Sequence, residues 1–519
     1  MVYELQRTTV DWEYHTERTR RHSLSSVNGV SWPRGLVLRG SGTINGMKYI
    51  RGNRRDYDRW KLLGNDGWGW DEVLEYFKKS EDNKVKRLAN GKWHSTGGYL
   101  SVDYYDDSDP MNRVLTDAAD EMGFQELADL NSDEYVGYGR SQFTIANGTR
   151  CSPAKAFLST IQHRKNLHVI KHAFVTTVSF EGNGTAVRGV NFILRNRFSM
   201  RALARKEVII SAGAVNTPKL LMLSGIGRRS AIAPVGISQR ADLDVGENLQ
   251  DHVAIPLFFK FNRSSRGIVN LTLEKILNLF IFTLKNRQQP LTNHYVSSVI
   301  AFVNTVSSDD PFPDVQFEYT QFKKGGSSSI IVTRAMGYNE QIVQSVHKAE
   351  LEADVVMARI HVLNPESRGK IRLASNDPYV DPIIDSGYLN DYEDLKTLVR
   401  AIRIQTQMLS TDSFRRNEAE LHRLPIPACR FILYDTDEYW ECYVRHLTTT
   451  LYHPSGTTKM GPDSDPGAVV DSRLKVKQVE NLRVIDASIM PFIVSGNTNA
   501  PTIMIGERGA DFIKQDYEL

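Results

Sequence analysis

The stretch Leu451-Tyr-His-Pro-Ser-Gly-Thr-Thr-Lys-Met-Gly461 contains the pattern that decides the fold of this chain. Its histidine, His453, stands beside Pro454 and Gly456, and this setting predicts a rigid turn rather than a helix interior. An isolated histidine in such a turn is usually structural. The role of His453 therefore depends on the motifs that accompany it.

A second stretch runs from Asn481 to Gly509. It predicts a short apolar strand that ends at Asp486, a polar loop, and then a helix entered through Asn499 and Pro501, because proline suits the first helical position. An acid at a strand end and backbone N–H groups at a helix start form a polar corner that can bind an anion.

Together these two stretches resemble the C-terminal part of the glucose–methanol–choline (GMC) flavoprotein oxidoreductases. In that family a histidine in a His-Pro-x-Gly-Thr turn faces a second histidine or an asparagine, and both lie over the flavin ring. The matching residues here are His453 and Asn497, so the resemblance implies that these two are catalytic and that FAD is the cofactor. It also implies cofactor-binding roles for Tyr452, Asp486, Ala487 and Thr498.

Other stretches extend the resemblance toward the N-terminus. Residues 36–60 resemble the first family signature, whose Asn-Gly segment approaches the flavin, although Arg39 stands where a glycine is usual. Residues 207–227 match the second signature, a strand–glycine–helix order, and residues 244–252 resemble another family segment. The cofactor-binding residues that the resemblance implies here are Gly40, Ser41, Asn45, Gly46 and Met47, with backbone contact to the adenine near Val175.

The implied fold class is mixed α/β, with a Rossmann-like flavin domain and a second, substrate-binding domain built on an antiparallel sheet. We expect residues 1–252 to be mostly flavin domain, with 68–145 partly in the substrate domain. Residues 253–470 form the substrate-binding domain, and 471–519 return to the flavin domain. Apolar patterns predict helices at 68–79 and 109–123 and strands at 167–178, 299–303, 315–319 and 354–363.

A flavin domain of this kind opens with a strand, the pattern G-x-G-x-x-G and a helix. Gly40, Gly42 and Gly46 have a different spacing, and no apolar strand precedes Trp32. We therefore expect an incomplete flavin domain. Two interpretations stay open at this point: a chain that lacks the first element of a full enzyme, or a short form that keeps the fold without FAD and acts, if at all, as a non-catalytic binding protein.

The function implied by the resemblance is FAD-dependent oxidation of a primary alcohol or sugar CH–OH group. A neutral histidine, whose unperturbed pKa is about 6.5, can accept the hydroxyl proton. In this mechanism His453 is the base, Asn497 donates a hydrogen bond to the developing alkoxide, and flavin N5 receives the hydride. No motif identifies the substrate or the electron acceptor, which is oxygen or a quinone-like carrier.

Composition excludes some other classes of function. The apolar content of 41% and charged content of 24% are typical of globular proteins, and a formal charge of +3 gives no support to nucleic-acid binding. No stretch reaches the roughly 18 apolar residues of a membrane span, and residues 271–284 predict an amphipathic core helix. Residues 1–7 show neither a signal-peptide nor a transit-peptide pattern, although family relatives are often secreted.

The three cysteines form no C-x-x-C pair, so no metal site is predicted. Cys429 and Cys442 can form one disulfide in an exported protein. Two further histidines, His252 and His446, are predicted to be structural.

Overall fold

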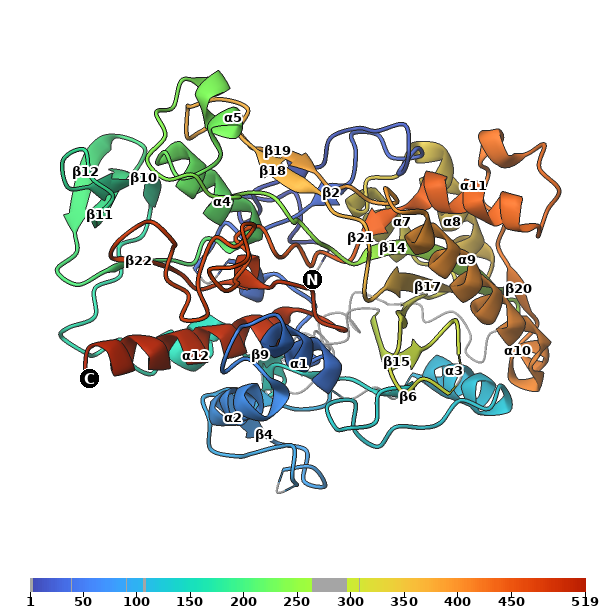
Figure 1. Cartoon of the computed structure of the whole chain (residues 1–519). Helices are drawn as coiled ribbons and strands as arrows, with labels where there is room; N and C mark the ends of the chain where they lie inside the picture. The colour runs from blue at the N-terminus through green and yellow to red at the C-terminus, as the bar shows by residue number, and fades with distance from the viewer. Residues whose placement is uncertain (1–2, 39, 90, 106–108, 264–295, 308) are drawn as a thin grey trace, which may run out of the picture.

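The computed structural model describes residues 3–38, 40–89, 91–105, 109–263, 296–307 and 309–519 (Figure 1). The C-terminal helix α12 (Asn499–Asp516) lies beside α2 (Trp70–Ser80), so segments from the first and last hundred residues of the sequence pack together. The helix α1 (Arg54–Leu62) packs against α2. Arg39 and the helix predicted at 271–284 fall outside the described residues.

The middle of the chain is built on a seven-stranded antiparallel sheet, which confirms the predicted architecture. In sheet order its strands are β20 (Ala419–Leu421), β14 (Val253–Phe261), β17 (Asp354–Val362), β16 (Val315–Phe322), β15 (Val296–Val303) and β6 (Gly137–Arg140), with β21 (Thr449–Thr450) paired to β14. The central strands β17 and β16 are buried along their whole length. Polar side chains that point out of them therefore lie inside the protein.

The described helices that pack on this sheet include α3 (Pro110–Glu121), α8 (Glu340–Glu352), α9 (Tyr392–Gln407) and α11 (Asp437–Leu447). Helix α3 begins where the sequence predicts. The Asp109 side chain accepts a hydrogen bond from the Met111 N–H, and Pro110 occupies the first helical position. Within the described ranges, no helix combines the length and apolar character needed to cross a membrane.

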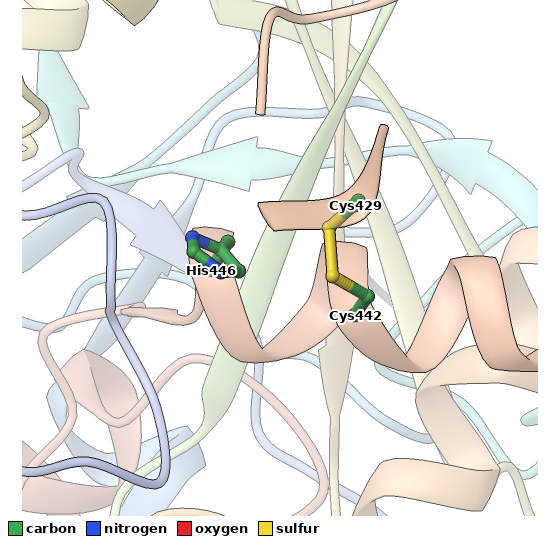
Figure 2. A group of neighbouring side chains, drawn as sticks. All are labelled: Cys429, Cys442 and His446. Carbon is green, nitrogen blue, oxygen red and sulfur yellow. A yellow bond between two sulfur atoms is a disulfide. The ribbon is translucent and has the colours of Figure 1, made fainter. Parts of the chain in front are cut away.

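A disulfide ties α11 to the short helix η5 (Pro427–Cys429) (Figure 2). It joins Cys442 to Cys429, the pair that the sequence offered. His446 lies one turn further along α11, and its ring and the two sulfurs fall within 4.8 Å of one another. The sulfurs are bonded to each other and are not thiolates, so this arrangement is a disulfide next to a histidine.

Outside the seven-stranded sheet, a parallel strand pair joins two distant parts of the chain. It consists of β13 (Val208–Ile210) and β22 (Leu482–Val484), and β13 leads into α4 (Gly213–Leu223) as predicted. Parallel strands end at the same edge of a sheet, so the residues that follow them meet there. The Gly213 N–H accordingly donates to the Asp486 carboxylate at 2.9 Å.

The strand predicted at 167–178 begins later, at Ala173, and this boundary is a correction. The strands β10 (Ala173–Phe180), β11 (Val187–Leu194) and β12 (Phe198–Leu203) form an antiparallel sheet in which Ala173 pairs with Leu194. The chain turns immediately after Leu194, through Arg195 and Asn196 at positive φ. Residues 167–172 therefore find no partner strand in this sheet.

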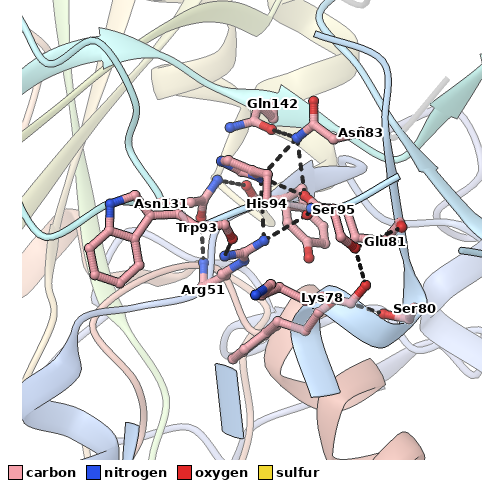
Figure 3. Close-up of polar contacts among 12 residues, drawn as sticks. Arg51, Lys78, Ser80, Glu81, Asn83, Trp93, His94, Ser95, Asn131 and Gln142 are labelled. Atoms are coloured by element: carbon pink, nitrogen blue, oxygen red, sulfur yellow. Dashed lines mark hydrogen bonds and ion pairs between the residues drawn. The ribbon is translucent and has the colours of Figure 1, made fainter. Parts of the chain in front are cut away.

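Four charged side chains form a buried cluster near the start of β4 (Glu81–Asn83) (Figure 3). The Arg51 guanidinium lies 3.0 Å from the Glu81 carboxylate, and both side chains are 0% exposed. His94 bridges Glu81 at 2.8 Å and Asp129 at 2.9 Å. Burial acts to lower the pKa of His94, but the two carboxylates outweigh it and raise that pKa.

Candidate active site

One large cavity, of about 1980 Å³, lies where the loop at residues 33–48, the start of α4 and the segments around residues 451–454 and 485–510 meet. Every residue that the sequence predicts for catalysis or cofactor binding lines it. These residues are Gly40, Ser41, Asn45, Gly46, Met47, Val175, Tyr452, His453, Asp486, Ala487, Asn497 and Thr498. The cavity exceeds the roughly 300–1,000 Å³ of ordinary small-molecule pockets, as a dinucleotide site with room for a substrate requires.

Three glycines present bare backbone to this cavity. They are Gly46, Gly213 and Gly506, and a Cβ added at any of them would meet no heavy atom of the described residues within 4 Å. Gly213 opens α4 with a φ of +82°, which an L side chain rarely adopts. Bare glycine backbone lets a ligand approach closely along the wall of this large cavity, so the residues present fit FAD.

The Asp486 carboxylate holds two edges of the cavity together. It is 5% exposed and accepts hydrogen bonds from the Gly213 N–H at 2.9 Å, the Thr217 hydroxyl at 2.6 Å and the Ser488 N–H at 2.8 Å. These bonds join the end of β22 to the start of α4. Asp486 is therefore satisfied from within the protein, and the helix start that it bonds is that of α4, whereas the sequence predicted a corner with the helix entered through Asn499.

Asn45 fixes the glycine-rich loop to the start of α12. Its side-chain N–H₂ donates to the Asn499 side chain at 3.0 Å, and its oxygen accepts from the Met47 N–H at 3.0 Å and from Arg150 at 2.8 Å. The side chain is thus engaged within the protein, and the loop backbone is the part that faces the cavity.

The predicted catalytic pair comes together at one end of the cavity. His453 Nε2 lies 3.4 Å from the Asn497 side-chain nitrogen. The backbone N–H of His453 donates to Asp251 at 2.8 Å, and the preceding Tyr452 has a φ of +67°. This anchored turn directs the imidazole toward Asn497.

The surroundings of His453 keep its ring neutral. Burial lowers the pKa of His453 well below 6.5, and the neighbouring histidines His252 and His361 lower it further. A neutral imidazole has one ring nitrogen free to accept a proton, which is what a general base needs.

His252 lies at the site, although the sequence gave it only a structural role. Its Nδ1 is 2.9 Å from His453 Nδ1, and its Nε2 is 3.1 Å from the Val494 carbonyl oxygen. It precedes β14, which pairs with β21 just before His453. The signal that could have found it is the family-like segment 244–252, which ends on Asp251-His252.

Glu318 on β16 is a second site residue that the sequence analysis missed. It accepts a hydrogen bond from the Asn497 side chain at 3.2 Å, and it forms ion pairs with Lys48 at 3.2 Å and Arg359 at 2.7 Å. Burial acts to raise the pKa of Glu318, but the two cations outweigh it and hold that pKa far below its usual range. A buried carboxylate with two cationic partners thus orients Asn497.

Comparison with known proteins now bears on this site. Two family models, both described as GMC oxidoreductase, match residues 21–254 and 365–506. A glucose dehydrogenase [FAD, quinone] of Drosophila pseudoobscura pseudoobscura is 37% identical over 511 residues, which are 98% of this chain and 79% of that protein. An alcohol dehydrogenase [acceptor] of Pseudomonas putida is 37% identical over 517 residues, 98% of this chain and 86% of that protein.

A similar solved structure is that of pyridoxine 4-oxidase from "Mesorbium loti". It superposes with a TM-score of 0.80 at 26% identity and covers 100% of this chain and 90% of its own. The family models, the near full-length relatives and the shared fold agree, and the chain belongs to the GMC oxidoreductase family.

Proposed function

We propose that this FAD-dependent oxidoreductase of CH–OH donors oxidises a primary alcohol or sugar hydroxyl, with His453 as the base and Asn497 as the hydrogen-bond donor to the substrate oxygen. Oxygen or a quinone-like carrier is the final electron acceptor. The observation that carries the proposal is the 3.4 Å approach of His453 Nε2 to the Asn497 side chain inside the large cavity.

The cofactor-binding residues in this proposal all line the cavity, and they are Gly40, Ser41, Asn45, Gly46, Met47, Val175, Tyr452, Asp486, Ala487 and Thr498. FAD, when bound, supplies the hydride acceptor that no protein side chain provides. The backbone of Gly46 and the N-terminus of α4 leave open space for it. The disulfide supports an oxidising compartment as the place where the protein works.

Gly46→Val is expected to lower FAD affinity about tenfold or more without loss of fold. The position has no positive φ and no described neighbour within 4 Å of an added Cβ, so the new side chain enters the cavity without backbone strain. Flavin bound per protein, measured by absorbance after FAD titration, checks this. Gly184→Val, in a turn that does not line the cavity, is the matched control, and equal FAD affinity in both variants would contradict the assignment.

His453 and Asn497 have different roles at the reacting hydroxyl in this proposal. His453 accepts the hydroxyl proton at Nε2, the ring nitrogen nearest Asn497. The Asn497 amide is held in one orientation, because its nitrogen donates to Glu318 and its oxygen accepts from Gln316 at 3.3 Å. A donor fixed in advance stabilises developing negative charge without the cost of reorganisation.

The rate of flavin reduction is expected to be level above pH 6.5 and to fall only in more acidic solution. Because burial lowers the pKa of His453 below its usual value, the neutral and competent base already dominates at pH 6.5 and at every higher pH. Anaerobic stopped-flow reduction of the FAD-loaded protein across a pH series measures this profile. An acid limb centred at or above pH 6.5 would show that His453 is not the base that titrates.

The direct test of the function is anaerobic titration of the FAD-loaded chain with neutral primary alcohols and glucose. Bleaching of the visible flavin bands is the expected result. Flavin that stays oxidised with every donor would overturn the proposal.

A further inference from the structure

Two histidine rings meet behind the catalytic pair, and their contact fixes where their hydrogens lie. His252 Nδ1 and His453 Nδ1 are 2.9 Å apart, and the ring planes are 89° to each other. A hydrogen bond between two ring nitrogens needs one protonated and one bare nitrogen. The other contacts of His252 decide which is which.

The second nitrogen of His252 faces a group that can only accept. Its Nε2 lies 3.1 Å from the Val494 carbonyl oxygen, so the ring hydrogen of a neutral His252 resides on Nε2. The side chain is 0% exposed. Burial lowers the pKa of His252 to about 4, against the opposing effect of the Val494 and Leu363 carbonyls, so the ring is neutral at neutral pH.

A neutral His252 with its hydrogen on Nε2 leaves a lone pair on Nδ1. His453 must then carry its own hydrogen on Nδ1 and donate it to His252. His453 Nε2 is left bare, and this is the nitrogen that lies 3.4 Å from Asn497. The chain of contacts from Val494 to Asn497 therefore permits one arrangement of hydrogens.

We propose that His252 is a positioning residue that holds His453 in the Nδ1–H tautomer, so that Nε2 is free to take the substrate proton. The inference rests on the proposed function of His453. It assigns to His252 the task that an aspartate performs in a Ser-His-Asp triad, here carried out by an uncharged acceptor. When His453 becomes an imidazolium, the same Nδ1–H···Nδ1 bond stabilises it.

Other groups also face the two rings. The ring centroid of His361 on β17 is 5.9 Å from that of His252. The pKa of His453 is affected by His361, Glu318 and Arg34. Asp251 accepts a hydrogen bond from the backbone N–H of His453. Among the described residues, His252 is the one whose side chain makes a hydrogen bond to His453 Nδ1. A substitution at His252 alone therefore tests the tautomer of His453 while the charged residues around the site stay unchanged.

The test compares His252→Leu with His252→Asn in the FAD-loaded protein. Leucine fills the space without an acceptor, whereas asparagine places an amide oxygen near the position of Nδ1. We expect His252→Leu to slow flavin reduction by about 100-fold with little change in bound FAD, and His252→Asn to recover at least about tenfold of that loss. His446→Leu, which alters a histidine bonded to Ser25 outside the cavity, is the control for the substitution itself.

A second readout does not depend on turnover. In protein labelled with ¹⁵N-histidine, the His453 resonances are expected to report Nδ1–H in the wild type and in His252→Asn, and to lose that pattern in His252→Leu. Equal rates in the leucine and asparagine variants, or an unchanged His453 tautomer in His252→Leu, would overturn the inference. A wild-type protein that no alcohol reduces would instead refute the proposed function.

Discussion

His453→Ala is expected to lower the rate of alcohol-dependent flavin reduction about 1000-fold while bound FAD stays at the wild-type level. The substitution removes the base next to Asn497 but keeps the backbone N–H that bonds Asp251, so the turn persists. General-base catalysis contributes roughly 100- to 10,000-fold to enzymatic rates, which sets the expected size. Single-turnover reduction under anaerobic conditions isolates this step from reoxidation.

The control for this prediction is His446→Ala, in the half-buried histidine beside the disulfide. It should reduce its flavin at the wild-type rate. If His453→Ala also did so, the proton would have to go elsewhere, and the whole assignment of the pair would fail. If both variants lost FAD, the effect would be one of folding.

Glu81→Gln is expected to lower the free energy of unfolding by about 3–5 kcal/mol, the cost of leaving a buried cation without its partner. Glu81 is 0% exposed and contacts both the Arg51 guanidinium at 3.0 Å and His94 at 2.8 Å. The glutamine keeps the size of the side chain and removes only the charge. Denaturant unfolding of the FAD-loaded protein, followed by circular dichroism, measures the difference.

The same substitution at an exposed ion pair provides the comparison. Glu340 lies 2.8 Å from Arg334, and the two side chains are 60% and 50% exposed. Glu340→Gln should leave the free energy of unfolding close to the wild-type value, because solvent screens the pair. Equal effects at both positions would show that burial does not control the cost.

The parts of the site that sequence could predict are those carried by local motifs. His453 stands in a Pro/Gly turn, Asp486 at a strand end and Asn497 just before a helix start, so each is recognisable from its neighbours. The long strands β15, β16 and β17 were predictable for a related reason, since each contains a run of apolar or alternating residues. Local patterns specify local structure.

What sequence could not predict depends on strand register. Glu318 faces Arg359 because β16 and β17 pair at that position, and His361 pairs with both Gln316 and Ala254 in the same sheet. A shift of one residue turns each of these side chains to the opposite face. The contacts of His252 and Asn497 could not be predicted for this reason. The start of β10 was predicted too early because its partner strand ends at Leu194.

The pairing of β13 with β22 has a consequence for the order of events during synthesis. Val208 lies beside Leu482, so this strand waits for a neighbour that is synthesised much later. The glycine-rich loop waits longer still, because Asn45 is anchored by Asn499. Domains fold as their segments emerge, so this strand pair and this loop anchor can form only after the later segments have been synthesised. A chain truncated before α12 would therefore leave the glycine-rich loop without its Asn499 anchor at the cavity.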